Sequence, residues 1–453
     1  MIEFSFSRAA EQLSARHLGP ESHFSAVSTD SRTLAAGDLF VALEGPNFDG
    51  HNYLELAAQH GASGAMVQHE VATGLPLLQV DSTLKGLGRL AALWRQRAGA
   101  SLVAVTGSNG KTTVKEMLAS ILRCRGEVLA TEGNLNNEIG LPLTLLRLQE
   151  QPYAVVEMGA NHTGEIDYLS RIAQPDVALL INAGRAHLEG FGSLEGVARA
   201  KGEIINGLAD NGCFIFNADD RWAGLWRQMA GERTYRTFGT VQSADVSSPE
   251  EAWEIVWSDG GFFSRFPVST PEGELQVKLP MAGRHNRMNA LAAITAAQVM
   301  GVDLSQISSG LESLRPVKGR LYPLVGSNGM QLVDDSYNAN PDSVSAAIEV
   351  LATAPGRRFL VLGELAEMGA GGERFYRELG ELARRSGIEH LYAVGAAVAA
   401  VDAFGNGGCG FAGRDELIEG LQQRLEPEDC VLVKGSRRAG MEQVINRFTM
   451  GTH

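Results

Sequence analysis

The segment with the clearest chemical signal is a glycine-rich turn at residues 107–113, which reads Gly-Ser-Asn-Gly-Lys-Thr-Thr. An apolar strand pattern, Ser101–Val105, precedes the turn, and a helical pattern, Thr112–Cys124, follows it. Glycines let consecutive backbone N–H groups point inward, and a helix N-terminus adds positive potential, so such a turn can hold phosphate oxygens. Lys111 would neutralise the outer phosphates, and the hydroxyl of Thr112 would reach a magnesium ion. The turn therefore predicts a nucleoside triphosphate site.

This turn departs from the standard phosphate-loop pattern at one position. Where that pattern has glycine, six residues before the lysine, this chain has Val105, and Gly107 follows two residues later. The alternative interpretation is an ordinary strand–turn–helix connection with a surface lysine, but the flanking strand and helix favour nucleotide binding. The residues predicted to hold the phosphates are Gly107, Ser108, Asn109, Gly110, Lys111, Thr112 and Thr113.

Three later residues, Glu157, His187 and Lys201, are considered as further candidates for nucleotide and metal binding. Glu157 ends a predicted strand, and the carboxyl ends of parallel strands meet at the sheet edge where ligands bind, so Glu157 could bind magnesium beside Thr112. His187 follows another strand, but on spacing alone a loop histidine is more often a surface residue than a ligand. Lys201 has the pattern of an ordinary solvated lysine on a helix, with nothing in its surroundings that indicates chemistry.

A second polar cluster follows a predicted strand in the last third of the chain. Residues 334–343 read Asp-Asp-Ser-Tyr-Asn-Ala-Asn-Pro-Asp-Ser. The pattern fits an Asx-rich turn in which Asn340 or Asp342 caps a helix, and it fits a binding site at a strand end equally well. Arg320, shortly before it, could present a guanidinium group to a phosphoryl group.

The elements that would position these residues alternate between strands and helices, as in parallel α/β sheets. In the middle of the chain the predicted strands are Ser101–Val105, Tyr153–Glu157, Val177–Asn182 and Cys213–Asn217. They are followed by a predicted hairpin at Glu254–Val268, an edge strand at Glu274–Leu279 and a long alanine-rich helix at Met288–Val302. After a Pro- and Gly-containing linker at 315–319, a second α/β pattern has strands at Gln331–Asp334, Phe359–Leu362, Leu391–Val394 and Cys430–Val433.

Length and composition limit what such a chain can be. Its 453 residues, at about 150 per domain, suggest three domains, placed at 1–82, 83–314 and 315–453. A net charge of -14 argues against a general nucleic-acid binder. The four cysteines have neither metal-site nor disulfide spacing, no apolar stretch is long enough to cross a bilayer, and the start of the chain is unlike a signal peptide. A cytoplasmic protein is expected.

These motifs, in this order, resemble those of the Mur ligase family, ATP-dependent enzymes that form amide bonds in bacterial cell-wall precursors. The resemblance covers essentially the whole chain, and the family's ATP loop departs from the standard pattern in the way seen here. The element His285–Ala293 matches the family's His-Asn-x-x-Asn-x-Leu-Ala-Ala sequence. The other residues that match family motifs are Glu157, His187, Lys201, Arg320 and Asp335.

The resemblance implies a role for each matched residue. Thr112 and Glu157 would hold a first Mg²⁺, while His187 and Lys201, the latter as an N-carboxylated (carbamate) lysine, would hold a second. A carbamate is an anion, which explains how this lysine could lie beside a dication. Lys111 and Arg320 would serve the transferred phosphoryl group. At the other end of ATP, Asn286 and Asn289 would lie by the adenine and Asp335 by the ribose.

Within the family, the chain looks most like the ligase that joins D-alanyl-D-alanine to UDP-N-acetylmuramoyl-tripeptide through an acyl phosphate, giving the pentapeptide precursor of peptidoglycan. Residues 28–32 and 49–51 resemble a uridine-nucleotide domain shared by the two later-acting ligases, and residues 335–341 resemble this ligase's C-terminal motif. The Asp-Asn-Pro-Arg motif, typical of many ligases that add diaminopimelate, is absent. The implied substrate contacts are Ser28, Thr29, Asp30, Ser31, Arg32, Asp49, Gly50, His51, Asn136, Asn137, Asn338 and Asn340.

The implied fold is α/β in three domains: a small uridine-nucleotide domain, a central parallel-sheet ATPase domain of the P-loop type, and a C-terminal Rossmann-like domain that swings to close the ATP site. A monomer is expected. Three alternatives stay open: the preceding ligase, which adds the third amino acid; a P-loop kinase of small molecules; and a non-catalytic nucleotide-binding switch. Folylpolyglutamate synthases rank lower because they lack the uridine-nucleotide domain. The sequence leaves open whether the third peptide residue is diaminopimelate or lysine.

Overall fold

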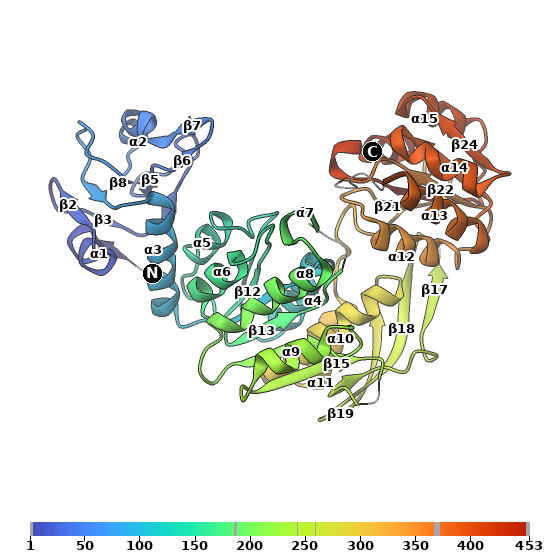
Figure 1. The fold of residues 1–453 in the computed structure, drawn as a ribbon, viewed down its shortest axis with the longest axis horizontal. Helices are drawn as coiled ribbons and strands as arrows, with labels where there is room; N and C mark the ends of the chain where they lie inside the picture. Colours follow the sequence, from blue (N-terminus) through green and yellow to red (C-terminus); the bar gives the residue numbers. More distant parts are fainter. Residues whose placement is uncertain (1–2, 185–187, 242, 259, 367–371, 450–453) are drawn as a thin grey trace.

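The structure is a computed structural model that describes residues 3–184, 188–241, 243–258, 260–366 and 372–449. Three α/β units follow one another along the chain, and the first and third lie at opposite ends of the central one (Figure 1). The expected α/β class and three-part organisation are therefore observed, while the boundaries at 82 and 314 stay predictions. No helix among the described residues is both long and apolar enough to cross a membrane.

The first unit is built on a five-stranded sheet in the order β2-β9-β8-β5-β4. Its middle strands are buried apolar runs, and β2 closes the sheet against β9 in antiparallel pairing. The bounds are β2 Arg16–Leu18, β4 Val27–Ser28, β5 Leu39–Val41, β8 Gly64–Val67 and β9 Leu77–Gln79, with α1 Phe6–Leu13 and α2 Leu54–Gln59 beside them. Two short pairs complete the unit: β1 Phe4–Ser5 with β3 His23–Phe24, and β6 Glu44–Gly45 with β7 Phe48–Asp49, which leads into the 3-10 helix η1 Gly50–Tyr53.

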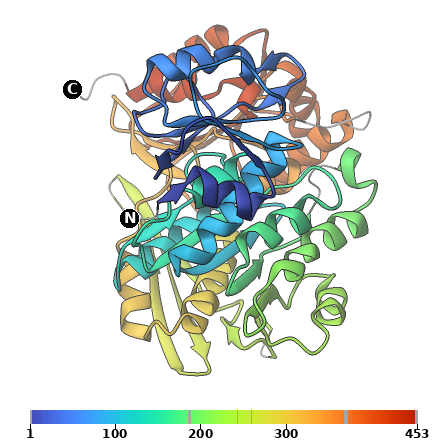
Figure 2. The ribbon, with the colours of Figure 1, turned by 90° about the vertical axis from the view of Figure 1, so that its left-hand side faces the viewer.

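Helix α3, Thr83–Ala98, joins the first unit to the second. The side chain of Ser82 caps its first turn, and Gly99, at φ 65°, ends it. Trp94 of this helix is fully buried and stacks on Phe4 of the first unit, while its indole N–H donates to the carbonyl of Leu148 in the second. The two units therefore share one hydrophobic core around α3. Figure 2 views the ribbon from the side of the first unit.

The central unit contains a ten-stranded sheet in the order β11-β12-β10-β13-β14-β15-β16-β18-β17, with β19 beside β18. The strands from β11 to β16 pair in parallel, and those from β16 onward pair antiparallel, which confirms the predicted hairpin. The strands are β10 Ser101–Thr106, β11 Val128–Ala130, β12 Tyr153–Glu157, β13 Val177–Leu180, β14 Cys213–Asn217, β15 Tyr235–Gly239, β16 Val246–Ser247, β17 Glu254–Ser258, β18 Gly261–Thr270 and β19 Gly273–Leu279.

Helices cover both faces of this parallel sheet, as expected for strands that are buried throughout. On one face α4 Lys111–Arg123 packs against α10 Arg284–Val299 and α11 Leu304–Glu312. The other helices of the unit are α5 Gly140–Leu145, α6 Glu165–Ala173, α7 Leu188–Phe191, α8 Leu194–Gly202, η2 Glu203–Gly207 and α9 Ala223–Ala230. Helix α10 begins four residues before the predicted start because its first turn is polar on the cavity side and lacks an apolar stripe.

The third unit is a six-stranded sheet in the order β20-β21-β25-β22-β23-β24, parallel except for the β20–β21 pair. Its strands are β20 Tyr322–Val325, β21 Gln331–Asp335, β22 Arg358–Leu362, β23 His390–Val394, β24 Gly408–Phe411 and β25 Cys430–Lys434. Its helices are α12 Pro341–Leu351, α13 Gly372–Arg385, η4 Gly395–Val398, α14 Ala399–Phe404, α15 Arg414–Gln422, η5 Arg437–Ala439 and α16 Glu442–Thr449. The linker at 315–319 carries no helix or strand, as predicted.

The third unit packs against the hairpin of the second. Trp257 of β17 donates from its indole N–H to the hydroxyl of Thr353, 3.0 Å away, just after α12. Phe262 of β18 is buried in the same core as the inner face of α12. This contact holds the third unit over the carboxyl ends of the central strands, where β10 leads into the glycine-rich turn.

Candidate active site

The glycine-rich turn is held rigidly between β10 and α4. Gly110 adopts φ 88°, and a Cβ there would lie 2.4 Å from the side-chain oxygen of Asn289, so this position needs glycine for both conformation and space. The backbone N–H of Asn109 donates to Asn182 Oδ1 (3.0 Å), and the N–H of Gly184 donates to Ser108 Oγ (2.9 Å). The turn is therefore fixed by the neighbouring strand end before any ligand binds.

Lys111 is the first residue of α4, and its ammonium group donates to the carbonyl of Gly107 at 2.7 Å. Burial lowers the pKa of Lys111, although nearby Glu157 opposes the shift and Arg320 adds to it. The cation thus folds back over the turn that it would share with an anionic ligand. The free N–H groups of the first turn of α4 lie at the same place.

Thr112 and Glu157 meet beside this turn, as the sequence predicted. The Thr112 hydroxyl donates to Glu157 Oε2 at 3.3 Å. Glu157 is 1% exposed, and its Oε1 atom makes no hydrogen bond. An orphaned buried carboxylate oxygen beside a hydroxyl is a suitable donor set for a divalent cation. Within the described residues there is no group of three or more His, Cys, Asp or Glu side chains that could hold a metal ion, so remaining ligands would come from phosphates and water.

Lys115 is a functional candidate that sequence reasoning missed. Its ammonium group is buried, donates to the carbonyl of Thr131 at 2.7 Å, and lies 3.8 Å from Glu157 Oε1 and 2.6 Å from Glu116. Lys111 and Lys115 are four residues apart, which puts them on one face of α4. This four-residue spacing is the sequence signal from which Lys115 could have been predicted as a site residue.

The burial of Lys201 contradicts the prediction made from its sequence pattern. The pattern predicted a solvated helix lysine, but the residue is 2% exposed. Helix α8 turns Val197 and Lys201, one helical turn apart, toward the protein interior. Burial and the nearby Lys111 cation lower the pKa of Lys201 well below its usual value, and no acidic side chain in the described chain offsets this. His187, predicted as its partner, lies outside the described residues.

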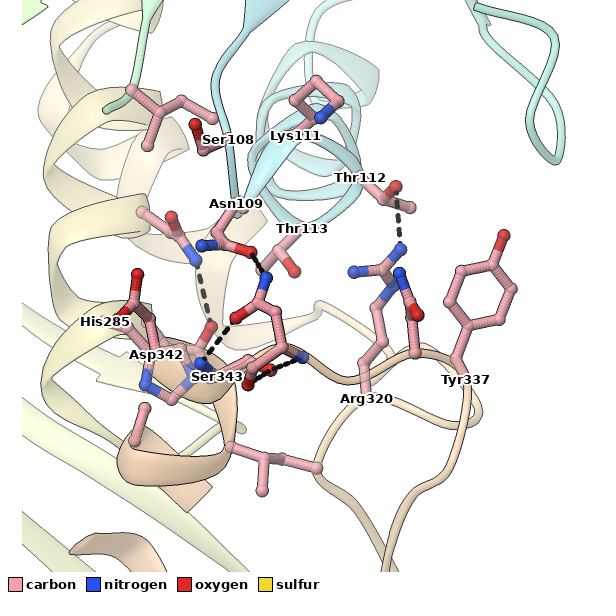
Figure 3. A pocket seen from close by; sticks show the side chains of 18 of the residues that line it. Ser108, Asn109, Lys111, Thr112, Thr113, His285, Arg320, Tyr337, Asp342 and Ser343 are labelled. Atoms are coloured by element: carbon pink, nitrogen blue, oxygen red, sulfur yellow. Dashed lines mark hydrogen bonds between the residues drawn. The ribbon is translucent and has the colours of Figure 1, made fainter. Parts of the chain in front are cut away.

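The third unit contributes Arg320 to the same place. The guanidinium of Arg320 donates to Thr112 Oγ1 at 3.2 Å and lies over the ring of Tyr337, 4.7 Å from its centroid (Figure 3). Asn340 caps α12 in a full capping box, which confirms the helix-cap interpretation of this segment, and its amide also donates to Asn109 Oδ1 at 2.8 Å. Two side chains of the third unit therefore contact the glycine-rich turn and its helix.

Asp335 and Lys434 form a buried ion pair at adjacent strand ends. Lys434 Nζ lies 2.6 Å from Asp335 Oδ2 and donates to the carbonyl of Asn338 at 3.0 Å. Burial raises the pKa of Asp335 despite the attraction of Lys434. Lys434 was missed because a lysine ending an apolar strand run gave no sequence signal. Its position, directly opposite Asp335 in the β21–β25 register, follows only from the strand order.

Asn286 and Asn289 are buried on the first turns of α10. Asn286 donates to the carbonyl of Ala282 (2.7 Å), and Asn289 donates to Asn286 Oδ1 (3.2 Å). Their neighbour His285 has a pKa lowered to about 4, first by burial and then by the Lys434 cation. His285, Asn286 and Asn289 line the same cavity as the phosphate turn, and because these three side chains are uncharged at neutral pH, they suit an uncharged heterocycle.

A cavity of about 470 Å³ lies between the second and third units and joins these groups (Figure 3). Most of the residues predicted to bind ATP line it, and the missed residues His285, Tyr337 and Lys434 line it as well. Gly107 does not line it, and Lys201 lies behind Lys111. The predicted residues on its wall are Ser108, Asn109, Gly110, Lys111, Thr112, Thr113, Asn136, Glu157, Asn286, Asn289, Arg320, Asp335, Asn338 and Asn340.

The residues predicted to contact a uridine nucleotide lie in the first unit, away from this cavity. Arg32 pairs with Asp30 through two bonds of 2.9 and 2.7 Å, which lowers the pKa of Asp30 to about 2. His51 is buried, bonds Asp49 through Nδ1 at 2.6 Å, and accepts the backbone N–H of Gln68 at Nε2. Ser28, Thr29, Ser31 and Gly50 lie on the same segments. Asn137, next to the cavity-lining Asn136, accepts the backbone N–H of Gly140 instead.

Models of known protein families match most of this chain. The Mur ligase middle domain matches residues 105–297, the glutamate ligase domain of Mur ligases matches 319–437, and the Mur ligase family catalytic domain matches 23–95. The chain is 43% identical, over 98% of both chains, to the UDP-N-acetylmuramoyl-tripeptide--D-alanyl-D-alanine ligase of Escherichia coli K12, and 40% identical, again over 98% of both, to that of Haemophilus influenzae.

Solved structures agree with these relatives. A crystal structure of MurF from Acinetobacter baumannii superposes with a TM-score of 0.91 at 35% identity over 99% of both chains. MurF from Thermotoga maritima, solved in complex with ADP, gives a TM-score of 0.83 at 30% identity over 94% of this chain and 97% of that one. With family matches over most of its length and these relatives over nearly all of it, this chain belongs to the Mur ligase family.

Proposed function

We propose that this chain is the ATP-dependent ligase that joins D-alanyl-D-alanine to UDP-N-acetylmuramoyl-tripeptide and gives the pentapeptide precursor of peptidoglycan. The observation that carries the proposal is the convergence of Lys111, Arg320 and the Thr112–Glu157 pair at one end of the cavity. The named relatives, which match over nearly the full length of the chain, support the choice of substrates.

The cavity suits ATP with its phosphates at the glycine-rich turn. The first N–H groups of α4 and the ammonium of Lys111 would bind phosphate oxygens, and the bond from Asn109 to Asn182 already holds the backbone of the turn. The uncharged side chains of Asn286 and Asn289 would lie by the adenine and Asp335 by the ribose. When bound, ATP supplies the phosphoryl group that converts the tripeptide's terminal carboxylate into an acyl phosphate, the form an amine can attack.

The protein's own contribution is charge neutralisation and positioning. Lys111 and Arg320 place two cations where a carboxylate oxygen and phosphate oxygens must approach one another, which offsets the repulsion between anions. Thr112 and Glu157 would hold Mg²⁺ there, with the orphaned Oε1 of Glu157 as a ready ligand. The third unit brings Arg320 to the turn, so its packing on the hairpin completes the site.

We further propose that Lys201 is N-carboxylated and, with His187, holds a second Mg²⁺. A lowered pKa leaves more of the amine neutral, and the neutral amine is the form that reacts with CO₂. The resulting carbamate would replace a buried cation beside Lys111 by an anion, which relieves repulsion. Intact-protein mass measurement with ¹³C-labelled bicarbonate tests this, with Lys201→Ala as the control.

The first unit would bind the uridine nucleotide through residues 28–32 and 49–51, and Asn136 would meet the muramoyl-peptide on its way to the cavity. We propose a monomer, because each unit needed for the site comes from one chain. Light scattering on the purified protein checks this, and a stable dimer would contradict it.

Product analysis separates the proposed reaction from its alternatives. With ATP, UDP-tripeptide and D-alanyl-D-alanine, phosphate release should require both substrates and yield one amide product. The preceding ligase would instead require UDP-dipeptide and a single amino acid. A small-molecule kinase would give a stable phosphorylated product and no amide, and a nucleotide switch would show no substrate-dependent turnover.

A further inference from the structure

Arg437 is a cation beside Tyr337, a residue that lines the cavity, and the site described above does not use it. It begins the short helix η5, directly after strand β25, and its side chain is exposed. Its guanidinium carbon lies 5.8 Å from the centroid of the Tyr337 ring. The same ring lies against Arg320, at 4.7 Å, and Arg320 bonds Thr112. A row of side chains therefore leads from the phosphate turn outward to Arg437.

The backbone that carries Arg437 is fixed, although its side chain is free. The N–H of Ser436 donates to the carbonyl of Glu364 at 2.7 Å, and Ala439 closes the turn by donating to Ser436 at 2.9 Å. Two residues before Ser436, the carbonyl of Lys434 accepts from the N–H of Gly363 at 2.8 Å. The guanidinium is thus presented from a rigid base, which favours recognition of a ligand over random solvation.

Arg437 has no anionic partner in the described part of the chain. Lys434, three residues earlier, is paired with Asp335, and Arg320 is bonded to Thr112, whereas the one recorded contact of Arg437 is the Tyr337 ring. The chain has 53 acidic and 39 basic residues, so a lack of acids does not explain this. A guanidinium left unpaired beside a cavity is well suited to bind a carboxylate through two parallel hydrogen bonds.

We propose that Arg437 binds the free carboxylate of the incoming dipeptide, with the Tyr337 ring as the wall beside it. This inference rests on the proposed function, in which the dipeptide's amine attacks a carbonyl held near Lys111 and Arg320. An extended dipeptide spans roughly 7 Å. The guanidinium carbons of Arg320 and Arg437 lie 4.7 and 5.8 Å from the centroid of the same Tyr337 ring, so a dipeptide lying along this ring with its amine near Arg320 would have its carboxylate near Arg437. Arg437 would then select acceptors by length and by a free terminal carboxylate.

The test compares Arg437→Gln with Arg438→Gln, which alters the adjacent exposed arginine that has no recorded contact with the cavity. Loss of a charge-assisted contact should raise KM for D-alanyl-D-alanine about tenfold to a hundredfold in Arg437→Gln. KM for ATP and UDP-tripeptide should stay within about twofold, and Arg438→Gln should behave as wild type. Unchanged KM for the dipeptide, or a rise confined to KM for UDP-tripeptide, would overturn the inference.

A second arm uses D-alanyl-D-alanine amide, which lacks the terminal negative charge. The wild type should use this amide about tenfold to a hundredfold less efficiently than the acid, and Arg437→Gln should use both alike, because the contact is already lost. Arg437→Lys, which keeps the charge, should recover part of the discrimination. A variant Arg437→Gln that still prefers the acid as strongly as wild type would refute the assignment. If the wild type forms no amide with either acceptor, the proposed function itself fails.

Discussion

At the scale of single residues, the site depends on polar groups that the protein leaves incompletely satisfied. Among the described residues, Glu157 keeps one buried oxygen without a hydrogen bond, Lys201 keeps a buried amine without an acidic partner, and Lys111 folds onto its own turn. Each arrangement raises the free energy of the unliganded site, and a bound ion of opposite charge lowers it. Residues of this kind are where the chemistry is expected.

Replacing Glu157 by Gln should lower kcat about a hundredfold or more and shift the Mg²⁺ dependence to higher concentration. The reason is that an amide keeps the shape but removes the anionic oxygen next to Thr112. Steady-state rates across a Mg²⁺ titration measure this. Glu116→Gln is the matched control, since Glu116 also pairs with Lys115 but does not line the cavity; equal losses in the two variants would argue against a metal role.

His285 predicts a pH dependence of stability. Its pKa is about 4 in the folded chain against an ordinary 6.5, so acid protonates the unfolded chain first. The stability that depends on neutral His285 is therefore complete above about pH 6.5 and is lost as the pH falls toward 4, by up to about 3 kcal/mol. Urea midpoints of wild type and His285→Asn should converge between pH 7.5 and pH 5. A constant difference between them would contradict this.

At the scale of elements, the site is assembled by the carboxyl ends of parallel strands in two sheets. Strands β10 and β12 of the central sheet end at the phosphate turn and at Glu157, while β21 and β25 of the third unit end at Asp335 and Lys434. Parallel pairing brings these ends together, because residues in register on neighbouring strands share one edge. The order of the strands thus decides which polar residues meet.

Substitutions in the Asp335–Lys434 pair test whether these neighbouring strand ends serve ATP binding as well as stability. Lys434→Met should lower the free energy of unfolding by about 3–5 kcal/mol, because it leaves Asp335 buried without its cation, and it should weaken ATP binding. Adding Asp335→Asn should restore much of the stability but not the ATP affinity. Thermal unfolding with and without nucleotide separates the two effects. Full recovery of both properties in the double variant would show that the pair serves packing alone.

Much of this element-scale architecture was predictable from the sequence. Apolar runs bounded by turn residues located β12 and β14 to the residue, and the glycine-rich turn located the start of α4 within one residue. What could not be predicted were polar residues hidden inside regular patterns. Lys115, Lys201 and Lys434 each sit in a helix or strand whose pattern allows a surface position, and only packing against another element shows that they are buried.

At the scale of the whole molecule, the cavity exists because the third unit rests on the hairpin of the second. The bonds from Trp257 to Thr353 and from Arg320 to Thr112 join segments far apart in the chain. Sequence spacing carries no information about such contacts, so the meeting of Asn340 with Asn109 could not be predicted. The first unit lies at the other end of the central unit from the third (Figure 1), so a substrate bound in the first unit would have to be long enough to reach along the central unit to the cavity.

Activation of the tripeptide's terminal carboxylate by phosphorylation in this cavity can be followed by oxygen transfer from that carboxylate to the released phosphate. UDP-tripeptide labelled with ¹⁸O in that carboxylate is incubated with ATP, D-alanyl-D-alanine and the protein, and the released phosphate is analysed by mass spectrometry. We predict one labelled oxygen in the phosphate for each amide formed, and loss of both the labelled phosphate and the amide in Lys111→Ala. Amide formation with unlabelled phosphate would contradict it.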